Sequence, residues 1–329
     1  MTTKRQSPLT AFFITEPNLM SLRTVESWLA GGNRISALWT KSHSLLRRKK
    51  RWRPIGRLLG YRDLHAICLE ADLPVYVYEN PKSVVSEMAR TIDRLQPDVL
   101  VTVITGLIIP SSILSRFGPR AINCHPSLLP HYKGPVPTCG MLVDGRANDC
   151  GGVTFHVLEG SVDTGPIIGQ RHLPRDAYSN NLVWEGARAE AAADIMRDEV
   201  CRYLAGSHAA TPQPPGSGCY RRPIPDEFTV TPTKSFDDVI SLLQTCDGLG
   251  LTCSPLVLGQ EGEHFPIKAV RRDHGVASGE SARLHQRSIT MDLDDKRVTL
   301  SRWSTMDTWW AIRQQITGMR MYRMHNMRT

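Results

Sequence analysis

Asn123 and His125 stand two residues apart at the end of a short apolar run, in the segment "INCHPSLLPHYKG". Alternate residues of a strand point to the same face, so the amide and the imidazole share one side while Cys124 points to the other. An amide N–H can donate a hydrogen bond to an oxygen that gains negative charge during a reaction. An imidazole can do the same or carry a proton. Because two prolines stiffen the backbone that follows, the pattern predicts two side chains held against one reacting oxygen.

A carboxylate follows downstream, at Asp163 in "HVLEGSVDTGPII" between two apolar runs. A carboxylate beside an imidazole can orient the ring and favour its charged form. Asn123, His125 and Asp163 are therefore a plausible catalytic set. No serine or cysteine is placed to be an activated nucleophile, and we interpret Cys124 as a packing residue.

From Pro97 to about Pro174 the sequence resembles the formyltransferase family, whose members use 10-formyltetrahydrofolate. Three motifs carry the resemblance, and here they read "PDVLVTVITGLIIP", "NCHPSLLPHYKG" and "GGVTFHVLEGSVDTG". Their order and spacing agree with the family pattern of a strand and "GxxxP" loop, then N-x-H-x-SLLP-x-x-x-G, then a "GVT…H…DTG" segment.

The resemblance implies a role for each matching residue. Asn123, His125 and Asp163 match the catalytic triad of the family, in which the first two bind the oxyanion and the third holds the imidazole and helps to move the proton of the amine. The family needs no metal, and we expect none here. The residues that match the folate site are Gly106, Leu107, Ile108 and Pro110, at the wall of the pterin pocket, and Leu158 and Val162, in the loop that closes over the folate.

The elements that must position these side chains alternate between strand and helix. Apolar runs such as "LTAFFIT", "RISALWT" and "PDVLVTVI" are separated by segments with helical spacing, among them "PKSVVSEMARTIDRL". Such a βαβ series predicts an α/β fold with a Rossmann-like, doubly wound and mainly parallel sheet, as the family resemblance also implies. Ligands of these sheets bind at the carboxyl ends of the strands, where Asn123 and His125 are expected.

The chain divides into four parts. Residues 1–205 form the expected catalytic domain, and residues 206–225, rich in proline, glycine and serine, form a linker. Short strand-like runs over residues 226–303 predict a second, smaller β-rich domain. Residues 304–329 form an amphipathic, basic tail, whose simplest interpretation is a helix docked over the second domain.

The formyl acceptor is less clearly indicated. The second domain lacks the "DW" and "PWPGA" type elements that are frequent in the methionyl-tRNA enzymes, so we favour a small anionic amine, such as an amino sugar linked to a nucleotide. A methionyl-tRNA formyltransferase is the alternative. A formyltetrahydrofolate hydrolase and a non-catalytic nucleic-acid-binding protein are weaker ones, because the triad is intact and no regulatory domain precedes residue 9.

A basic run bears on this choice. Arg47, Arg48, Lys49 and Lys50 belong to "LLRRKKRWRPIGR", in the loop expected after the second strand. Dense positive charge there would attract an anionic acceptor, whether a nucleotide sugar or tRNA, although a solvated loop is the commoner role of such a run.

Composition limits the other classes of function. The chain has 329 residues and a net charge of +8, which favours anionic partners. No apolar run approaches the roughly 20 residues of a membrane helix, so no membrane partner is expected. The eight cysteines are scattered without a C-x-x-C pair, which argues against a zinc site and a disulfide framework and favours a reducing, cytoplasmic location.

Overall fold

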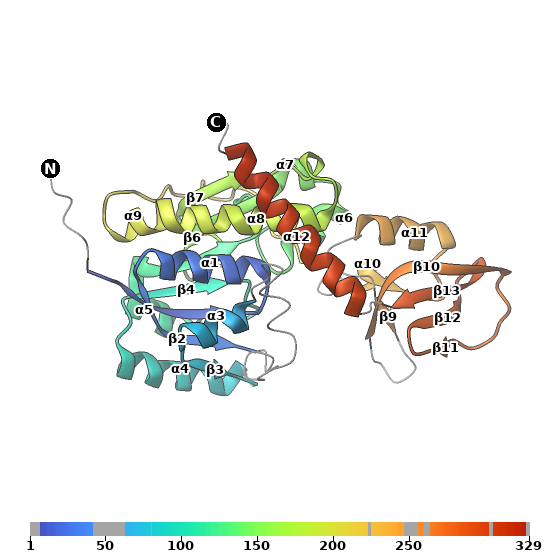
Figure 1. Ribbon diagram of the computed structural model, residues 1–329, viewed down its shortest axis with the longest axis horizontal. Helices are drawn as coiled ribbons and strands as arrows, with labels where there is room; N and C mark the ends of the chain where they lie inside the picture. The colour runs from blue at the N-terminus through green and yellow to red at the C-terminus, as the bar shows by residue number, and fades with distance from the viewer. Residues whose placement is uncertain are drawn as a thin grey trace.

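Two β-sheets form the centres of two domains in the computed structural model of the chain (Figure 1). The structure describes residues 7–41, 63–79, 81–222, 225–246, 256–258, 264–302 and 305–326. The larger sheet has seven strands in the order β3-β2-β1-β4-β5-β6-β7. Its strands are β1 (Thr10–Thr15), β2 (Arg34–Thr40), β3 (Val75–Val77), β4 (Val99–Val103), β5 (Ala121–His125), β6 (Gly152–Val157) and β7 (Ile167–His172).

The first five strands of this sheet run parallel, and β6 and β7 join antiparallel. The predicted doubly wound, mainly parallel sheet is therefore confirmed. The strand order reverses between β1 and β4, so the crevice at their carboxyl ends is where this architecture binds ligands. β5, which carries Asn123 and His125, is the next strand beyond β4.

Helices cover both faces of the large sheet. The helices of this domain are α1 (Leu19–Ala30), α3 (Leu64–Glu70), α4 (Pro81–Leu95), α5 (Ser111–Phe117), α6 (Pro137–Val143), α7 (Ala147–Cys150), α8 (Asn181–Ile195) and α9 (Cys201–Leu204), with a π-helical turn (Met196–Val200) between the last two. Adjacent residues of β1 show the consequence, because Phe12 packs into one hydrophobic cluster and Phe13 into the other. A parallel strand that is buried on both faces needs a nearly continuous apolar sequence, and β1 and β4 have one apart from their threonines.

The second domain is built on a sheet of order β11-β12-β13-β10-β9-β8. Its strands are β8 (Thr229–Val230), β9 (Leu256–Leu258), β10 (His264–Val276), β11 (Arg283–Leu284), β12 (Ser288–Asp292) and β13 (Lys296–Arg302), and its helices are α10 (Pro225–Phe228) and α11 (Phe236–Thr245). Val239 of α11 and Ile267 and Val298 of the sheet belong to a hydrophobic cluster of their own. The expected smaller β-rich domain is therefore present.

Helix α12 (Thr305–Asn326) packs along α8 of the first domain, as Figure 1 shows. The expectation that this segment covers the second domain is wrong. Two glycines explain the close approach of the helices. A Cβ atom added to Gly186 would lie 1.9 Å from the carbonyl oxygen of Gln315, and one added to Gly318 would lie 1.7 Å from that of Val183. Glu190 of α8 also binds Arg23 of α1 and Arg323 of α12.

Six cysteines of the described residues are free, whereas Cys139 is disulfide-bonded. The sequence does not predict this bond, because the cysteines show no paired spacing. Among the described helices, none combines the length and the apolar character needed to span a bilayer.

The α8–α12 crossing yields a stability prediction for Gly186→Ala and Gly318→Ala. Alanine in a helix interior is normally more favourable than glycine by roughly 1 kcal/mol. Here the added methyl group has no space, so we expect each change to lower the free energy of unfolding by about 1–3 kcal/mol, measured by urea denaturation. Gly160→Ala is the control, because its Cβ would enter open space. Stabilisation by either helical substitution would contradict the tight crossing.

Candidate active site

The three residues that the sequence singles out lie together at the carboxyl end of β5. Asp163, from the loop after β6, reaches back to both of the others. Its Oδ1 lies 3.4 Å from Nδ2 of Asn123, and its Oδ2 lies 3.5 Å from Nδ1 of His125. Cys124 points to the opposite side, where its sulfur lies 3.6 Å from that of Met20 in the core.

The amide of Asn123 has a fixed orientation. The Thr102 hydroxyl donates a hydrogen bond to Oδ1 of Asn123 (2.7 Å), so Nδ2 faces the other way, 3.0 Å from Nε2 of His156. One N–H of the amide is therefore used by His156. The other points towards Asp163 at a longer distance and can be given to an incoming oxygen.

His156 is a site residue that the sequence reasoning missed. It is fully buried and stands directly opposite Asn123 in the antiparallel pairing of β5 and β6. Its Nδ1 lies 2.8 Å from the carbonyl oxygen of Val157, which assigns the proton to Nδ1 and leaves Nε2 as the acceptor for Asn123. The sequence signal that could have indicated His156 was a single histidine within the apolar segment "GGVTFHVL".

The backbone of the loop that follows His125 binds its imidazole ring on the side away from Asp163. Its Nε2 lies 2.8 Å from the carbonyl oxygen of Tyr132, so Nε2 donates the hydrogen bond and Nδ1 faces Asp163. Burial lowers the pKa of His125, and this effect outweighs the opposing influence of the Asp163 carboxylate. The resting imidazole is therefore neutral, with its Nδ1 lone pair directed into the site.

Asp163 is fixed by backbone groups as well as by side chains. The N–H of Gly134 donates to its Oδ2 at 2.8 Å, and Gln213 of the linker donates to its carbonyl oxygen at 3.0 Å. Burial by itself would raise the pKa of Asp163. The positive charge that His125 carries once it is protonated at acid pH reverses this effect, together with the hydrogen bond from the Gly134 N–H, and the pKa of Asp163 falls to about 2. Asp163 also adopts a left-handed backbone conformation, with φ of 53°.

The segment between His125 and Gly134 folds back on itself, so that its far end meets the site. The hydroxyl of Thr154 binds the carbonyl oxygen of Ser127 at 2.7 Å, and the amide of Gln170 binds that of Leu129 at 2.7 Å. At the end of the segment Gly134 has φ of 98°, which favours glycine. A Cβ atom there would lie 2.6 Å from the ring of Tyr220, so a larger residue would disturb the donor to Asp163.

Of the six residues expected to bind folate, four follow β4 and two lie in the segment after β6. Gly106, Leu107, Ile108 and Pro110 lie in the connection from β4 to α5, at the carboxyl edge of the sheet. Ile108 is 78% exposed and Val162 is 44% exposed, so both present apolar surface to solvent.

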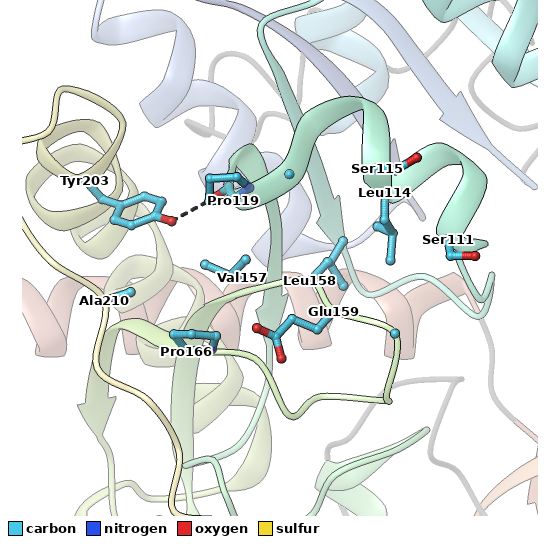
Figure 2. A pocket seen from close by; sticks show the side chains of 12 residues that line it. Ser111, Leu114, Ser115, Pro119, Val157, Leu158, Glu159, Pro166, Tyr203 and Ala210 are labelled. Atoms are coloured by element: carbon cyan, nitrogen blue, oxygen red, sulfur yellow. Dashed lines mark hydrogen bonds between the residues drawn. The ribbon is translucent and has the colours of Figure 1, made fainter.

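Leu158 lines an open pocket of about 600 Å³ between α5 and the loop after β6 (Figure 2). The walls include Leu114, Val157, Pro166 and Tyr203, with Ser111 and Glu159 as polar groups. Figure 2 shows the Leu114 side chain extending from α5 towards the segment that carries Leu158 and Glu159. The volume is in the range of pockets that bind small ligands.

Arg47, Arg48, Lys49 and Lys50 lie outside the described residues. The structure therefore does not relate the basic run to the site. Among the residues that are described, no group of three or more histidine, cysteine, aspartate or glutamate side chains is placed to hold a metal ion.

Part of the chain matches known proteins. Residues 41–183 match the family model described as formyl transferase. The methionyl-tRNA formyltransferase of Listeria monocytogenes is 34% identical over 177 residues, which cover 53% of this chain and 55% of that protein. The chain thus matches the curated relatives over about half of their length.

Solved structures resemble nearly the whole chain at low identity. HypX from Aquifex aeolicus in complex with tetrahydrofolic acid aligns with a TM-score of 0.56 and 13% identity, over 89% of this chain and 44% of that chain. An N-formyltransferase from Helicobacter canadensis, solved with folinic acid and dTDP-3-aminofucose, aligns with a TM-score of 0.53 and 13% identity, over 88% and 98%. At this identity the likeness establishes the fold.

The low pKa of Asp163 yields a prediction for acid stability. The pKa of about 2 lies below the reference value of 3.8, so the ionised carboxylate stabilises the folded protein above about pH 4, and this stabilisation is lost as the pH falls towards 2. The full contribution is about 2 kcal/mol. We expect the difference in unfolding free energy between the wild type and Asp163→Asn to shrink by about 1.5 kcal/mol from pH 5 to pH 2.5 in urea titrations, because pH 2.5 still lies above the folded-state pKa. A difference that does not change with pH would contradict the assignment.

Proposed function

We propose that the protein is an N-formyltransferase that moves a formyl group from 10-formyltetrahydrofolate to a primary amine, in keeping with the match of residues 41–183 to the formyl transferase family model. The observation that carries the proposal is the convergence of the Asn123 amide, the His125 imidazole and the Asp163 carboxylate within 3.5 Å contacts at one strand end. Their order and spacing in the sequence match the triad of the family.

The donor fits the features around this centre. The pterin ring of a folate is flat and apolar on its faces, with polar groups at its edge. The pocket beside Leu158 offers apolar walls from Leu114 and Val157 and polar atoms from Ser111 and Glu159. Exposed Ile108 and Val162 would contact the rest of the donor as it passes the site. When bound, the donor supplies an activated formyl carbon.

The chain's own residues then bind an oxygen and move a proton. The N–H of Asn123 that points to Asp163 would donate to the formyl oxygen as negative charge develops there. The neutral Nδ1 of His125 and the ionised Asp163 are the proton acceptors of the site, so they would take the proton of the attacking amine. The same proton is then returned to the folate nitrogen as its bond to the formyl carbon breaks. Tyr132 holds His125 throughout.

A small anionic amine, such as an amino sugar linked to a nucleotide, is the acceptor that we favour. This choice is supported by the absence, from the second domain, of the elements that are frequent in the tRNA enzymes, while the net charge of +8 favours an anionic acceptor of either kind. Methionyl-tRNA is the second candidate, because the Listeria relative with 34% identity bears that name.

An acceptor screen tests the proposal. The purified protein is incubated with 10-formyltetrahydrofolate and one amine at a time, including dTDP- and UDP-linked amino sugars and methionyl-tRNA, and release of tetrahydrofolate is followed by absorbance. We expect turnover with a nucleotide-linked amino sugar. Turnover with methionyl-tRNA alone would replace our acceptor, and no turnover with any amine would refute formyl transfer.

Substitutions in the triad should lower kcat steeply. Removal of one oxyanion donor costs on the order of 10²–10³ in rate, so we expect losses of that size for Asn123→Ala, and comparable losses for His125→Ala and Asp163→Asn. Circular dichroism checks that each variant is folded. His131→Ala is a control in the same loop with an exposed side chain, and we expect it to retain kcat within about threefold. A folded His125→Ala protein with the kcat of the wild type would exclude the proposed proton transfer.

The location of the donor site is tested by two matched substitutions on α5. Ser111→Trp places a bulky ring in the pocket, whereas Ser112→Trp places it at the neighbouring exposed position, which does not line the pocket. We expect Ser111→Trp to weaken binding of 5-formyltetrahydrofolate at least tenfold and to reduce the thermal shift that the ligand produces, since a ligand that binds only the folded state must stabilise it. Ser112→Trp should bind like the wild type. Equal affinities of the two variants would place the donor elsewhere.

A further inference from the structure

Arg188 is a buried cation that the chemistry described above does not use. It lies on α8 with 2% of its surface exposed, and its guanidinium stacks over the ring of Trp184 at 4.0 Å. Its Nη1 donates to the carbonyl oxygen of Pro126 at 3.2 Å and to the hydroxyl of Thr138 at 2.9 Å. Both partner residues follow β5 in the chain.

These two contacts join α8 to both ends of the loop behind the active site. Pro126 is the residue directly after His125, and Thr138 is the second residue of α6. The loop between them supplies the Tyr132 carbonyl that binds His125 and the Gly134 N–H that binds Asp163. One guanidinium therefore fixes the start of the loop and the helix that follows it.

Stability alone does not account for this arginine. No carboxylate among the described residues forms an ion pair with it, and within the same residues its Nε has no hydrogen-bond partner. Burial lowers the pKa of Arg188 to about 10, against the opposing influence of Glu185, which itself accepts a hydrogen bond from Gln315 of α12 at 3.0 Å. A buried charge that is incompletely compensated costs free energy, and an apolar side chain of similar volume is often as stable or more so.

We propose that Arg188 is a positioning residue for formyl transfer, which holds the Pro126 carbonyl and the start of α6 and thereby fixes the direction of His125. The inference rests on the proposed function. It predicts a loss in the chemical step, because a misplacement of about 1 Å in a catalytic group can cost on the order of 10²-fold in rate. Binding of the donor should change little, since Arg188 does not line the pocket beside Leu158.

Arg188→Met is the main test, because methionine fills much of the same volume without the donors. We expect kcat to fall by about 10- to 100-fold while the KM for 10-formyltetrahydrofolate stays within about twofold. Glu190→Gln is the matched control on the same helix. Glu190 is similarly buried, but its ion-pair partners Arg23 and Arg323 belong to α1 and α12 and not to the loop. It should lower the unfolding temperature and leave kcat unchanged.

A second readout does not depend on formyl transfer. The Cε1–H signal of His125 in NMR spectra should move in Arg188→Met, together with its titration midpoint, and should stay in place in Glu190→Gln. If no acceptor is turned over by the wild type, the proposed function fails while this signal still decides the role of Arg188. A folded Arg188→Met protein with unchanged kcat and an unchanged His125 signal would overturn the inference.

Thr138→Val keeps the test decisive if Arg188→Met does not fold. The change removes the hydroxyl that accepts from Arg188 and preserves the shape of the side chain. We expect a two- to fivefold fall in kcat and a smaller movement of the His125 signal in the same direction. Wild-type values for both would overturn the inference. Where both variants fold, the double variant should lose no more than Arg188→Met alone, since the two residues act through one contact.

Discussion

The contact between the Asp163 carboxylate and the N–H of Gly134 is the constraint on which the site depends. It joins the loop after β6 to the loop after β5, above the paired strands β5 and β6. Asp163 adopts a left-handed conformation to make it, and Gly134 is the residue type that its own backbone angle favours. Without this contact the carboxylate would have no fixed position between the two histidines, and the amide of Asn123 would lack its second partner.

Two imidazoles share this one carboxylate and have different tasks. The proton on His156 is committed to the Val157 carbonyl, so its other nitrogen can only accept, and it orients Asn123. The Nε2–H of His125 donates to the Tyr132 carbonyl oxygen, so its Nδ1 faces the site. The backbone carbonyl that each ring binds thus decides its tautomer, and the tautomers separate a structural histidine from one that can exchange protons.

Local sequence was sufficient to predict most strands and helices and to single out Asn123, His125 and Asp163, which the structure brings together, but it did not reveal the residues that hold them. Asn18 caps α1 as a short polar residue before an apolar face should, and α4 spans the segment that its spacing predicts. His156 could not be found in this way, because its importance comes from a strand register that pairs it with Asn123 across the sheet. Arg188 looks like an ordinary charge on an alanine-rich helix until the tertiary structure buries it. The position of α12 depends on two glycines far apart in the chain, each of which is unremarkable alone.

The crossing of α12 over α8 also affects how the protein is made. Synthesis runs from the N-terminus, so α8 leaves the ribosome long before its partner does, and the whole second domain is translated in between. During that interval the surface of α8 around Val183 and Gly186 stays uncovered, and the first domain lacks part of its packing. The first domain can therefore complete its packing only after translation has passed the second domain.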